Sequence, residues 1–154
     1  MYLVNKKVVV TGCSGFIGFH LSNSLLDSDH TVIGIDSLNN AYDVKLKEKR
    51  LEELNKKENF LFLNNNLSEK NSLDEVKKHE LTTFYHLAAR AGVRQSFLDP
   101  NSYIEDNTLA TTNISNFCKE MSVQDLILAS TSSIYGDSGE NLMVEEKDEK
   151  IKPP

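Results

Sequence analysis

The sequence contains few of the residues that mark disulfide-rich or metal-binding proteins. Its 154 residues include no tryptophan, three prolines and two cysteines, Cys13 and Cys118, which are far apart and lack the spacing of metal ligands. Two isolated cysteines exclude a disulfide framework and favour a reducing compartment. We therefore expect a cytoplasmic protein without a structural metal.

Long apolar runs and an excess of basic charge are lacking too. No apolar stretch approaches the roughly 20 residues that a membrane-spanning helix needs, and residues 1–6 lead directly into a strand pattern without the features of a signal peptide. The formal net charge is −6, and the lysines of residues 45–57 are interleaved with glutamates. We therefore expect neither nucleic acids nor membranes as partners. The length suits a single globular domain, residues 1–154.

The segment that organises the chain is residues 7–18, KVVVTGCSGFIG. A β-branched run ends at Gly12, which permits a tight turn; Gly15 lets the backbone approach a pyrophosphate, and Gly18 lets the next helix pack closely on the strand. The free N–H groups at the start of that helix form a natural anion site. This pattern predicts a dinucleotide-binding loop, to which we also assign Ser14, Phe16 and Ile17.

An acidic residue ends the second predicted strand. Asp36 follows Gly12 by 24 residues and can accept hydrogen bonds from an adenosine ribose. A carboxylate there would also repel a 2′-phosphate, which favours NAD over NADP. The alternative is that Asp36 only caps the polar loop after it, but the distance from the glycine loop favours the ribose role. From that loop we add Ser37, Asn39 and Asn40 to the cofactor site.

Strand and helix patterns alternate along the chain. Strands are predicted at 6–11, 31–35, 60–63, 82–87 and 124–129, and helices at 15–27, 43–57, about 69–79 and 100–120. This alternation predicts an α/β fold, a Rossmann-like doubly wound parallel sheet that stops after the fifth strand. Ligands of such folds bind at the carboxyl ends of the strands, where the candidate residues fall.

The apolar spacing also predicts which faces are buried. On the first helix we expect burial of Phe16, Ile17, Leu21, Leu25 and Leu26. On the second we expect burial of Leu46, Leu51 and Leu54, with the lysines solvated. On the long helix the expected inner face is Ile104, Leu109, Ile114 and Phe117. In the last strand Leu126, Ile127 and Leu128 should be buried.

Further candidates lie at later strand ends. Asn66 and Leu67 could hold the edge and face of adenine, or the asparagines could simply form a turn. Leu87, Ala88 and Ala89 follow the fourth strand, where small residues let a ligand approach the backbone. His86 lies within that strand, so we expect a core histidine that is hydrogen-bonded rather than catalytic. Asn107 should lie close to the inner face of its helix.

Several segments together resemble the extended short-chain dehydrogenase/reductase family, the NAD-dependent sugar-nucleotide epimerases and dehydratases. They are residues 11–18 (TGCSGFIG), 36–39 (DSLN), 86–94 (HLAARAGVR), Pro100 with Tyr103 and Asn107, and 130–136 (STSSIYG). The resemblance covers the whole chain, and residues 36–47 and 86–94 look most like UDP-glucuronate 4-epimerases. It implies cofactor contacts for the residues named above, including Asn107 and Ala129.

The resemblance also implies a mechanism, a transient oxidation at C4 of a UDP-sugar by NAD. Thr131 occupies the position of the hydroxyl that helps to hold the sugar oxygen in catalysis, and Ser132 and Ser133 could donate hydrogen bonds to a sugar carboxylate. A dehydratase of the family would be expected to carry Asp-Glu after that threonine. The Ser-Ser pair therefore favours an epimerase.

The base of this mechanism is the tyrosine of a Tyr-x-x-x-Lys motif, and no such motif follows Thr131; Tyr135 is followed four residues later by Gly139. We therefore expect a fragment that binds NAD and is inactive alone. A non-catalytic dinucleotide-binding module, or a fragment of a related dehydratase or reductase, are the alternatives. An uncovered fifth strand also predicts self-association, for example as a homodimer.

Overall fold

A computed structural model describes residues 6–131. The first part of the chain forms β1 (Lys7–Thr11), α1 (Phe16–Asp27), β2 (Thr31–Ile35), α2 (Val44–Leu54) and β3 (Phe60–Leu63). The second part forms the 3₁₀ turn η1 (Val76–Lys78), β4 (Thr83–His86), α3 (Val93–Leu98), α4 (Pro100–Tyr103), the π-helical segment η2 (Ile104–Leu109), α5 (Ala110–Glu120) and β5 (Asp125–Leu128).

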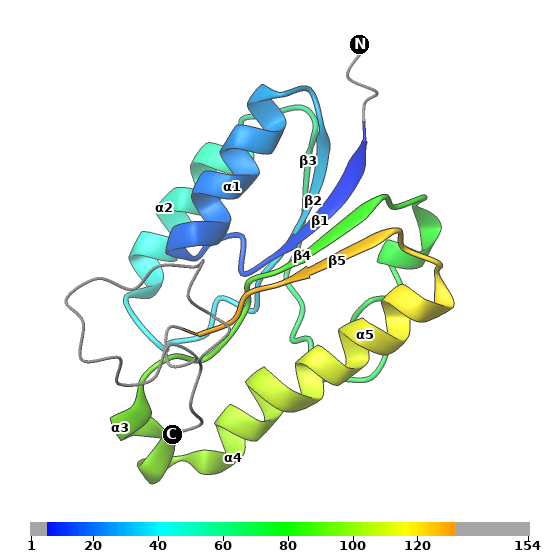
Figure 1. Ribbon diagram of the computed structural model, residues 1–154. Helices are drawn as coiled ribbons and strands as arrows, with labels where there is room; N and C mark the ends of the chain where they lie inside the picture. The colour runs from blue at the N-terminus through cyan, green and yellow to red at the C-terminus, as the bar shows by residue number, and fades with distance from the viewer. Residues whose placement is uncertain (1–5, 132–154) are drawn as a thin grey trace, which may run out of the picture.

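The strands form one parallel sheet in the order β3-β2-β1-β4-β5. Helices α1 and α2 cover one face, and α5 lies against the other (Figure 1). The order reverses at β1, since β2 and β3 lie on one side of it and β4 and β5 on the other. The predicted doubly wound fold is thus confirmed, with its switch point beside the glycine loop.

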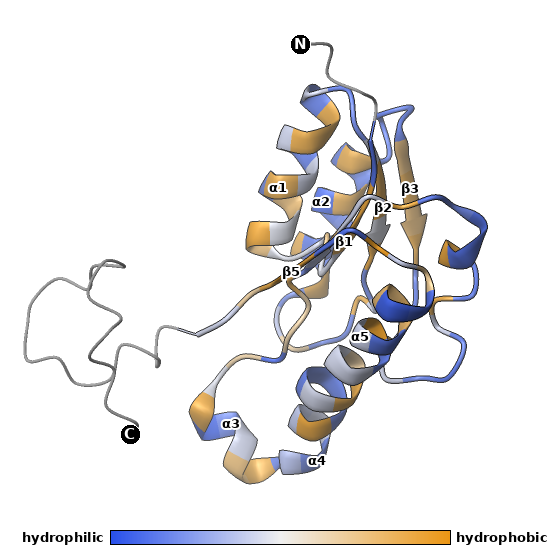
Figure 2. Cartoon of the chain, turned by 45° about the vertical axis from the view of Figure 1, so that its right-hand side comes forward, coloured by the Kyte–Doolittle hydropathy of each residue, from blue (hydrophilic) through white to orange (hydrophobic). Residues whose placement is uncertain are grey.

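The strands at the centre of the sheet are buried on both faces, which explains their continuous apolar sequences. Val9, Ile33 and Phe84 point to the α5 side, where they pack with Ile114 and Phe117. Val8, Val10 and Val32 point to the α1–α2 side and pack with Leu26 and Leu54. Figure 2 shows the hydrophobic strands at the centre, between helices that carry both hydrophilic and hydrophobic residues.

The predicted buried face of α1 is wrong at its start. Phe16 and Ile17 are 67% and 64% exposed, whereas Gly18, Ser22 and Leu26 are buried. These three follow at four-residue intervals and include two small residues, so the helix approaches the sheet closely. A Cβ atom on Gly18 would lie 2.0 Å from the Gly12 carbonyl oxygen, which rules out any larger residue there. Leu21 and Leu25 pack partly against the core, as predicted.

The burial of α2 also differs from the prediction. Leu54 is buried as expected, but Leu46 is 43% exposed and Lys47 is 4% exposed. The prediction that the lysines of this helix are all solvated is therefore wrong for Lys47. Its position four residues before Leu51 and seven before Leu54 puts it on the inner stripe.

The segment before β5 is more broken than the predicted helix 100–120. It consists of α4, the π-helical turn η2 and α5, and it is preceded by the unpredicted α3. Ile114 and Phe117 are buried, but Ile104 and Leu109 are 58% and 43% exposed. Both exposed residues lie in the π turn η2, where the wider turn changes the helical phase, so they no longer share the inner face of α5. The helix predicted at 69–79 is only the turn η1.

Strand β5 lies at the edge of the sheet and is exposed. Leu126, Ile127 and Leu128 are 38%, 47% and 53% exposed, so their predicted burial is wrong. The strand hydrogen-bonds to β4 on one side, and within residues 6–131 no strand pairs with its other side. Apolar sequence therefore identified the strand correctly but did not indicate what covers it.

Candidate cofactor-binding cleft

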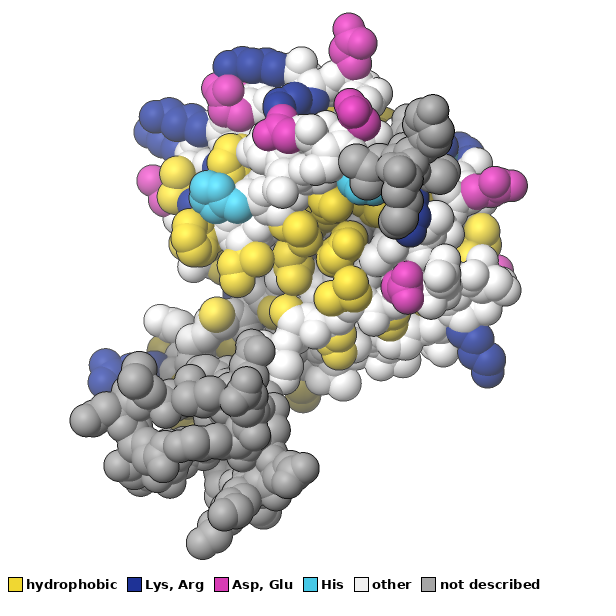
Figure 3. All heavy atoms as spheres, turned by 45° about the horizontal axis from the view of Figure 1, so that its top comes forward, with side chains coloured by type: hydrophobic (Ala, Val, Ile, Leu, Met, Phe, Trp, Pro, Cys, Tyr) yellow, Lys and Arg dark blue, Asp and Glu magenta, His cyan; other side chains and the backbone are white. Residues whose placement is uncertain are grey.

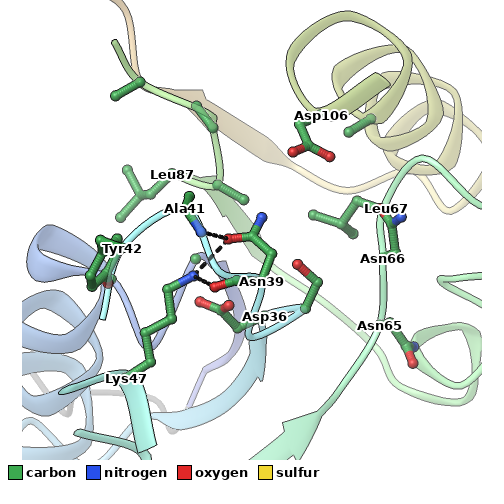
Figure 4. A pocket seen from close by; sticks show the side chains of 17 residues that line it. Asp36, Asn39, Ala41, Tyr42, Lys47, Asn65, Asn66, Leu67, Leu87 and Asp106 are labelled. Atoms are coloured by element: carbon green, nitrogen blue, oxygen red, sulfur yellow. Dashed lines mark hydrogen bonds between the residues drawn. The ribbon is translucent and has the colours of Figure 1, made fainter. Parts of the chain in front are cut away.

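A cleft of about 370 Å³ lies at the carboxyl ends of β1, β2, β3 and β4 (Figure 4). Ten of the predicted cofactor residues line it: Gly12, Gly15, Asp36, Ser37, Asn39, Asn66, Leu67, Leu87, Ala88 and Ala89. The structure thus brings together segments separated by more than seventy residues, as expected for the switch point of a doubly wound sheet.

The glycine loop forms the floor of the cleft. Gly12 has a φ of +68°, and a Cβ atom there would lie 3.0 Å from both N and Cα of Ala88. The Gly15 N–H donates to the Gly12 carbonyl (2.8 Å), which closes the turn before α1. Gly15 is the N-cap of α1 and makes no side-chain cap hydrogen bond. The amides of the first turn, including those of Phe16 and Ile17, therefore need other partners, such as an anion or water.

Asp36 lines the cleft and is 8% exposed. Its Oδ2 accepts the backbone N–H of Ser14 (3.1 Å), and its Oδ1 accepts that of Leu38 (2.9 Å). The carboxylate therefore caps its loop, as the alternative interpretation had it. A carboxylate has about four acceptor positions, so it also keeps capacity for ribose hydroxyls.

Lys47 is a cleft residue that the sequence analysis missed. Its ammonium donates to the backbone carbonyl and to Oδ1 of Asn39, both at 2.9 Å, and lies 4.7 Å from the centroid of the Tyr42 ring. Figure 4 shows it on the same side of the cleft as Asp36. Burial lowers the pKa of Lys47, and the Asp36 charge opposes that shift. The ammonium thus holds the loop after β2 in place.

Tyr42 joins this loop to the glycine loop. Its hydroxyl donates to the Ser14 carbonyl (3.2 Å) and accepts from Arg50 Nη1 (3.2 Å). Burial raises the pKa of Tyr42, against the effect of the Arg50 charge. The hydroxyl is therefore a hydrogen-bonding group of the loop and not a base at neutral pH.

Asn66 and Leu67 line the opposite side of the cleft (Figure 4). The Asn66 Oδ1 accepts both the backbone N–H (3.1 Å) and the hydroxyl (2.9 Å) of Ser68. This is the turn that the alternative interpretation described, and it fills both acceptor positions of the oxygen. A contact with adenine, which stays a prediction, would have to come from the Nδ2 amide.

His86 is 2% exposed and sits between two hydroxyl groups. Its Nδ1 lies 2.8 Å from Thr11 Oγ1, and its Nε2 lies 3.0 Å from Thr111 Oγ1. Burial lowers the pKa of His86 to about 4. The prediction of a hydrogen-bonded core histidine is confirmed.

Asn107 does not line the cleft. Its Oδ1 accepts the Arg90 N–H (2.7 Å), and its Nδ2 donates to the Arg90 carbonyl (3.0 Å), so it holds the backbone after β4 at both ends of one residue. The Arg90 side chain donates from Nε to Asp106 (2.8 Å), which does line the cleft. In the structure Asn107 thus supports the backbone at Arg90, and its contact with the cofactor stays a prediction.

Other predicted residues lie outside the cleft lining. They are Ser14, Phe16, Ile17, Gly18, Asn40, Ala129 and Thr131. Ser14 is buried behind Asp36, and the Ala129 N–H donates to the His86 carbonyl (3.0 Å). Ser132 and Ser133 lie outside the described residues. The lining residues that sequence reasoning missed are Ala41, Tyr42, Lys47, Asn65, Ala91, Asp106 and Ala110.

Residues 6–131 contain neither a metal centre nor a membrane span. No group of three histidine, cysteine, aspartate or glutamate residues in this part of the chain could hold a metal ion. No helix in the same residues combines the length and the hydropathy needed to cross a membrane. Cys13 and Cys118 are buried and free, and burial raises the pKa of both thiols.

A comparison with protein families agrees with this geometry. The model of the NAD dependent epimerase/dehydratase family matches residues 8–154. The chain belongs to this family. NAD is the family's cofactor, as the glycine spacing and Asp36 predicted, and the resemblance stated from the sequence motifs is confirmed.

Two relatives show how similar in sequence this chain is to other proteins. A UDP-glucuronate 4-epimerase of Thermodesulfobacterium geofontis is 44% identical over 128 residues, covering 82% of this chain and 40% of the relative. An uncharacterised protein of Methanocaldococcus jannaschii is 42% identical over 152 residues, covering 97% of this chain and 46% of the relative. The chain therefore spans less than half the length of these relatives.

Solved structures are similar in fold. The UDP-glucuronic acid 4-epimerase of Bacillus cereus, in complex with UDP-glucuronic acid and NAD, superposes with a TM-score of 0.81 and 32% identity. That match covers 91% of this chain and 44% of the other. The UDP-N-acetylglucosamine 4-epimerase of Methanobrevibacter ruminantium matches with a TM-score of 0.78 and 29% identity, covering 98% of this chain and 45% of that one.

Proposed function

We propose that residues 1–154 form the NAD-binding part of a sugar-nucleotide 4-epimerase of the UDP-glucuronate/UDP-galacturonate type. The observation that carries this proposal is the convergence of the glycine loop, Asp36 and residues 87–89 on one cleft, in a chain of an NAD-dependent family. The names of its relatives support the UDP-glucuronate specificity. The free cysteines support a place in the cytoplasm.

The residues present fit NAD. Gly12 allows the backbone to turn in close contact with Ala88, where a side chain would not fit. The first turn of α1 has no side-chain cap, so its N–H groups are available to a pyrophosphate. Asp36 would accept the adenosine ribose hydroxyls, and Asn66 with Leu67 would border the adenine. Lys47 holds Asn39 and so shapes the wall next to Asp36.

NAD, when bound, supplies the hydride acceptor for oxidation of a sugar carbon. The chain's own residues in the described part bind and orient it: the glycine loop through backbone amides, Asp36 through its carboxylate. Thr131 would hold a sugar oxygen, and Ser132 and Ser133 a sugar carboxylate. Because no Tyr-x-x-x-Lys motif follows Thr131, a base for C4 oxidation is lacking in these 154 residues, and we propose that they do not epimerise alone.

Titration calorimetry tests the proposal. We expect the 154-residue chain to bind NAD in the micromolar-to-millimolar range and to bind NADP more weakly, because the Asp36 carboxylate repels a 2′-phosphate. Asp36→Ala should weaken NAD binding by about tenfold or more, from the loss of charged hydrogen bonds of roughly 1.5–3 kcal/mol.

The matched control is Asp27→Ala, which removes an exposed carboxylate at the opposite end of α1 and should leave NAD affinity unchanged. Thermal unfolding of each variant confirms that it is folded. A folded wild-type chain that binds no NAD would contradict both the proposed function and the alternative of a stand-alone dinucleotide-binding module.

A further inference from the structure

A continuous chain of hydrogen bonds joins three segments around the cleft. It runs from Thr11, directly before the glycine loop, to His86 at the end of β4, and on to Thr111 in the first turn of α5. The Thr111 hydroxyl then lies 2.6 Å from the carbonyl oxygen of Asn107 in the π-helical segment. Each of these segments also contributes residues to the cleft lining.

The donor and acceptor of each hydrogen bond in this series follow from the acceptor positions of the Thr11 hydroxyl oxygen. A hydroxyl has one hydrogen and two acceptor positions. The backbone N–H groups of Leu87 and Ala88 both donate to Thr11 Oγ1, each at 3.1 Å, and fill those positions. The Thr11 hydrogen must therefore go to His86 Nδ1, which accepts it and carries no proton.

The remaining protons are then fixed as well. A neutral imidazole without a proton on Nδ1 carries it on Nε2, so Nε2–H donates to Thr111 Oγ1, and the Thr111 hydroxyl donates to the Asn107 carbonyl. A proton on Nδ1, in the other tautomer or in the imidazolium, would bring a third donor to Thr11 Oγ1. Thr11 is fully buried, so water offers no alternative partner.

We propose that the Thr11–His86–Thr111 chain positions the cofactor-binding loops, with His86 held as a neutral positioning residue in its Nε2–H form. The inference rests on the proposed NAD site. Through Thr11, this chain of hydrogen bonds holds the amides of Leu87 and Ala88 beside Gly12. The two segments are in close contact, since a Cβ atom added to Gly12 would lie 3.0 Å from Ala88. A small displacement of these amides would therefore change the floor of the cleft.

The other end of this hydrogen-bond chain acts on a later part of the segment that follows β4. Thr111 fixes the carbonyl of Asn107, whose side-chain amide holds the backbone of Arg90 at both its N–H and its carbonyl. The segment after β4 is thus held at Leu87 and Ala88 by Thr11 and at Arg90 by Asn107. His86 itself lies outside the cleft lining, so it acts through these neighbours.

The first test is independent of NAD. In the ¹⁵N-labelled chain at neutral pH, long-range proton–nitrogen correlation of the His86 ring should show a protonated Nε2 and an unprotonated Nδ1. Thr11→Val, which removes the donor to Nδ1, should raise the population of the Nδ1–H form, and Thr11→Ser should restore the wild-type pattern. A protonated Nδ1 in the wild-type chain would overturn the proposal.

The second test compares two neighbouring threonines in NAD titrations. Thr111→Val removes the acceptor of His86 Nε2–H, whereas Thr112→Val removes only the exposed bond from Thr112 to the Thr108 carbonyl (2.8 Å). We expect Thr111→Val to weaken NAD binding about tenfold, from one unpaired buried donor, and Thr112→Val to change it less than twofold.

Equal NAD affinities of the two folded variants would overturn the positioning role, because a purely structural loss would lower the melting temperature without a selective effect on binding. If the wild-type chain bound no NAD, the proposed function would fall with the positioning role, whereas the tautomer measurement would still decide the proton arrangement. The two failures are therefore distinguishable.

Discussion

At the scale of the residue, Lys47 shows how one charged side chain can occupy the inner stripe of a helix. It is almost fully buried, yet its ammonium is satisfied by two oxygens of Asn39 and by the face of the Tyr42 ring. A buried charge is costly unless it is hydrogen-bonded, and here the partners lie in the loop that follows Asp36. The residue therefore stabilises the wall of the cleft rather than the surface of the helix.

Lys47→Met should destabilise the chain and weaken NAD binding together. Methionine keeps the length of the aliphatic stem but leaves the Asn39 carbonyl oxygen without the Lys47 donor and Oδ1 with only the Ala41 N–H (3.3 Å). We expect this loss to lower the free energy of unfolding by about 1–3 kcal/mol. Lys45→Met, at an exposed position on the same helix, is the control and should change neither quantity. Urea denaturation and calorimetry measure the two effects; unchanged stability in Lys47→Met would show that Asn39 finds other donors.

At the scale of the element, His86 joins β4 to β1 and to α5. Its folded pKa of about 4 lies below the ordinary value of 6.5, so the unfolded chain binds the proton more readily. Stability from this group is therefore fully present above about pH 6.5 and is lost progressively as the pH falls towards 4.

We expect the free energy of unfolding to fall by on the order of 2–3 kcal/mol between pH 7 and pH 4 through this group, at about 1.4 kcal/mol per pKa unit. His86→Gln should flatten this part of the profile, whereas His20→Gln, on the exposed side of α1, should leave it unchanged. Denaturant unfolding across this pH range measures both; an identical slope in His86→Gln and the wild type would contradict the assignment.

The elements differ in how well the sequence predicted them. Central strands such as β1 and β2 were predicted well, because burial on both faces makes their sequences continuously apolar. The burial of Phe16 and Ile17 was predicted wrongly, because helical spacing alone does not reveal that the small residues Gly18 and Ser22 let α1 approach the sheet more closely. The π-helical turn η2 leaves no signal in apolar spacing, so the exposure of Ile104 and Leu109 could not be anticipated.

The cleft, too, contains residues that the sequence predicted and residues that it did not. The glycine loop and Asp36 have a strong local pattern and were found, and so were the small residues after β4. Lys47 and Asp106 approach the cleft from helices, and only the fold brings them there. A sequence signal for Lys47 did exist, since it shares the inner stripe with Leu51 and Leu54.

At the scale of the whole molecule, the edge of the sheet is the least protected feature. β5 carries three exposed apolar residues and pairs on one side only within residues 6–131. Figure 3 shows a face of the molecule on which hydrophobic side chains gather in one patch, with charged side chains around it. Unpaired apolar edges of this kind favour association between chains.

We therefore expect the 154-residue chain to self-associate as its concentration rises, and Ile127→Lys to suppress this. Leu61→Lys is the matched control, because Leu61 is similarly exposed (42%, against 47% for Ile127) on β3 at the opposite edge of the sheet. Size-exclusion chromatography with light scattering gives the mass. A wild-type monomer at all concentrations, or equal suppression by Leu61→Lys, would contradict a role of the β5 edge.

Binding of NAD in the cleft can be followed residue by residue in amide nitrogen–proton correlation spectra of the labelled chain titrated with NAD. We expect the largest shifts at residues 12–18, 36–39 and 87–89, and smaller shifts with NADP at the same concentration. Shifts confined to other surfaces, or no shifts from a folded chain, would contradict binding of NAD in this cleft.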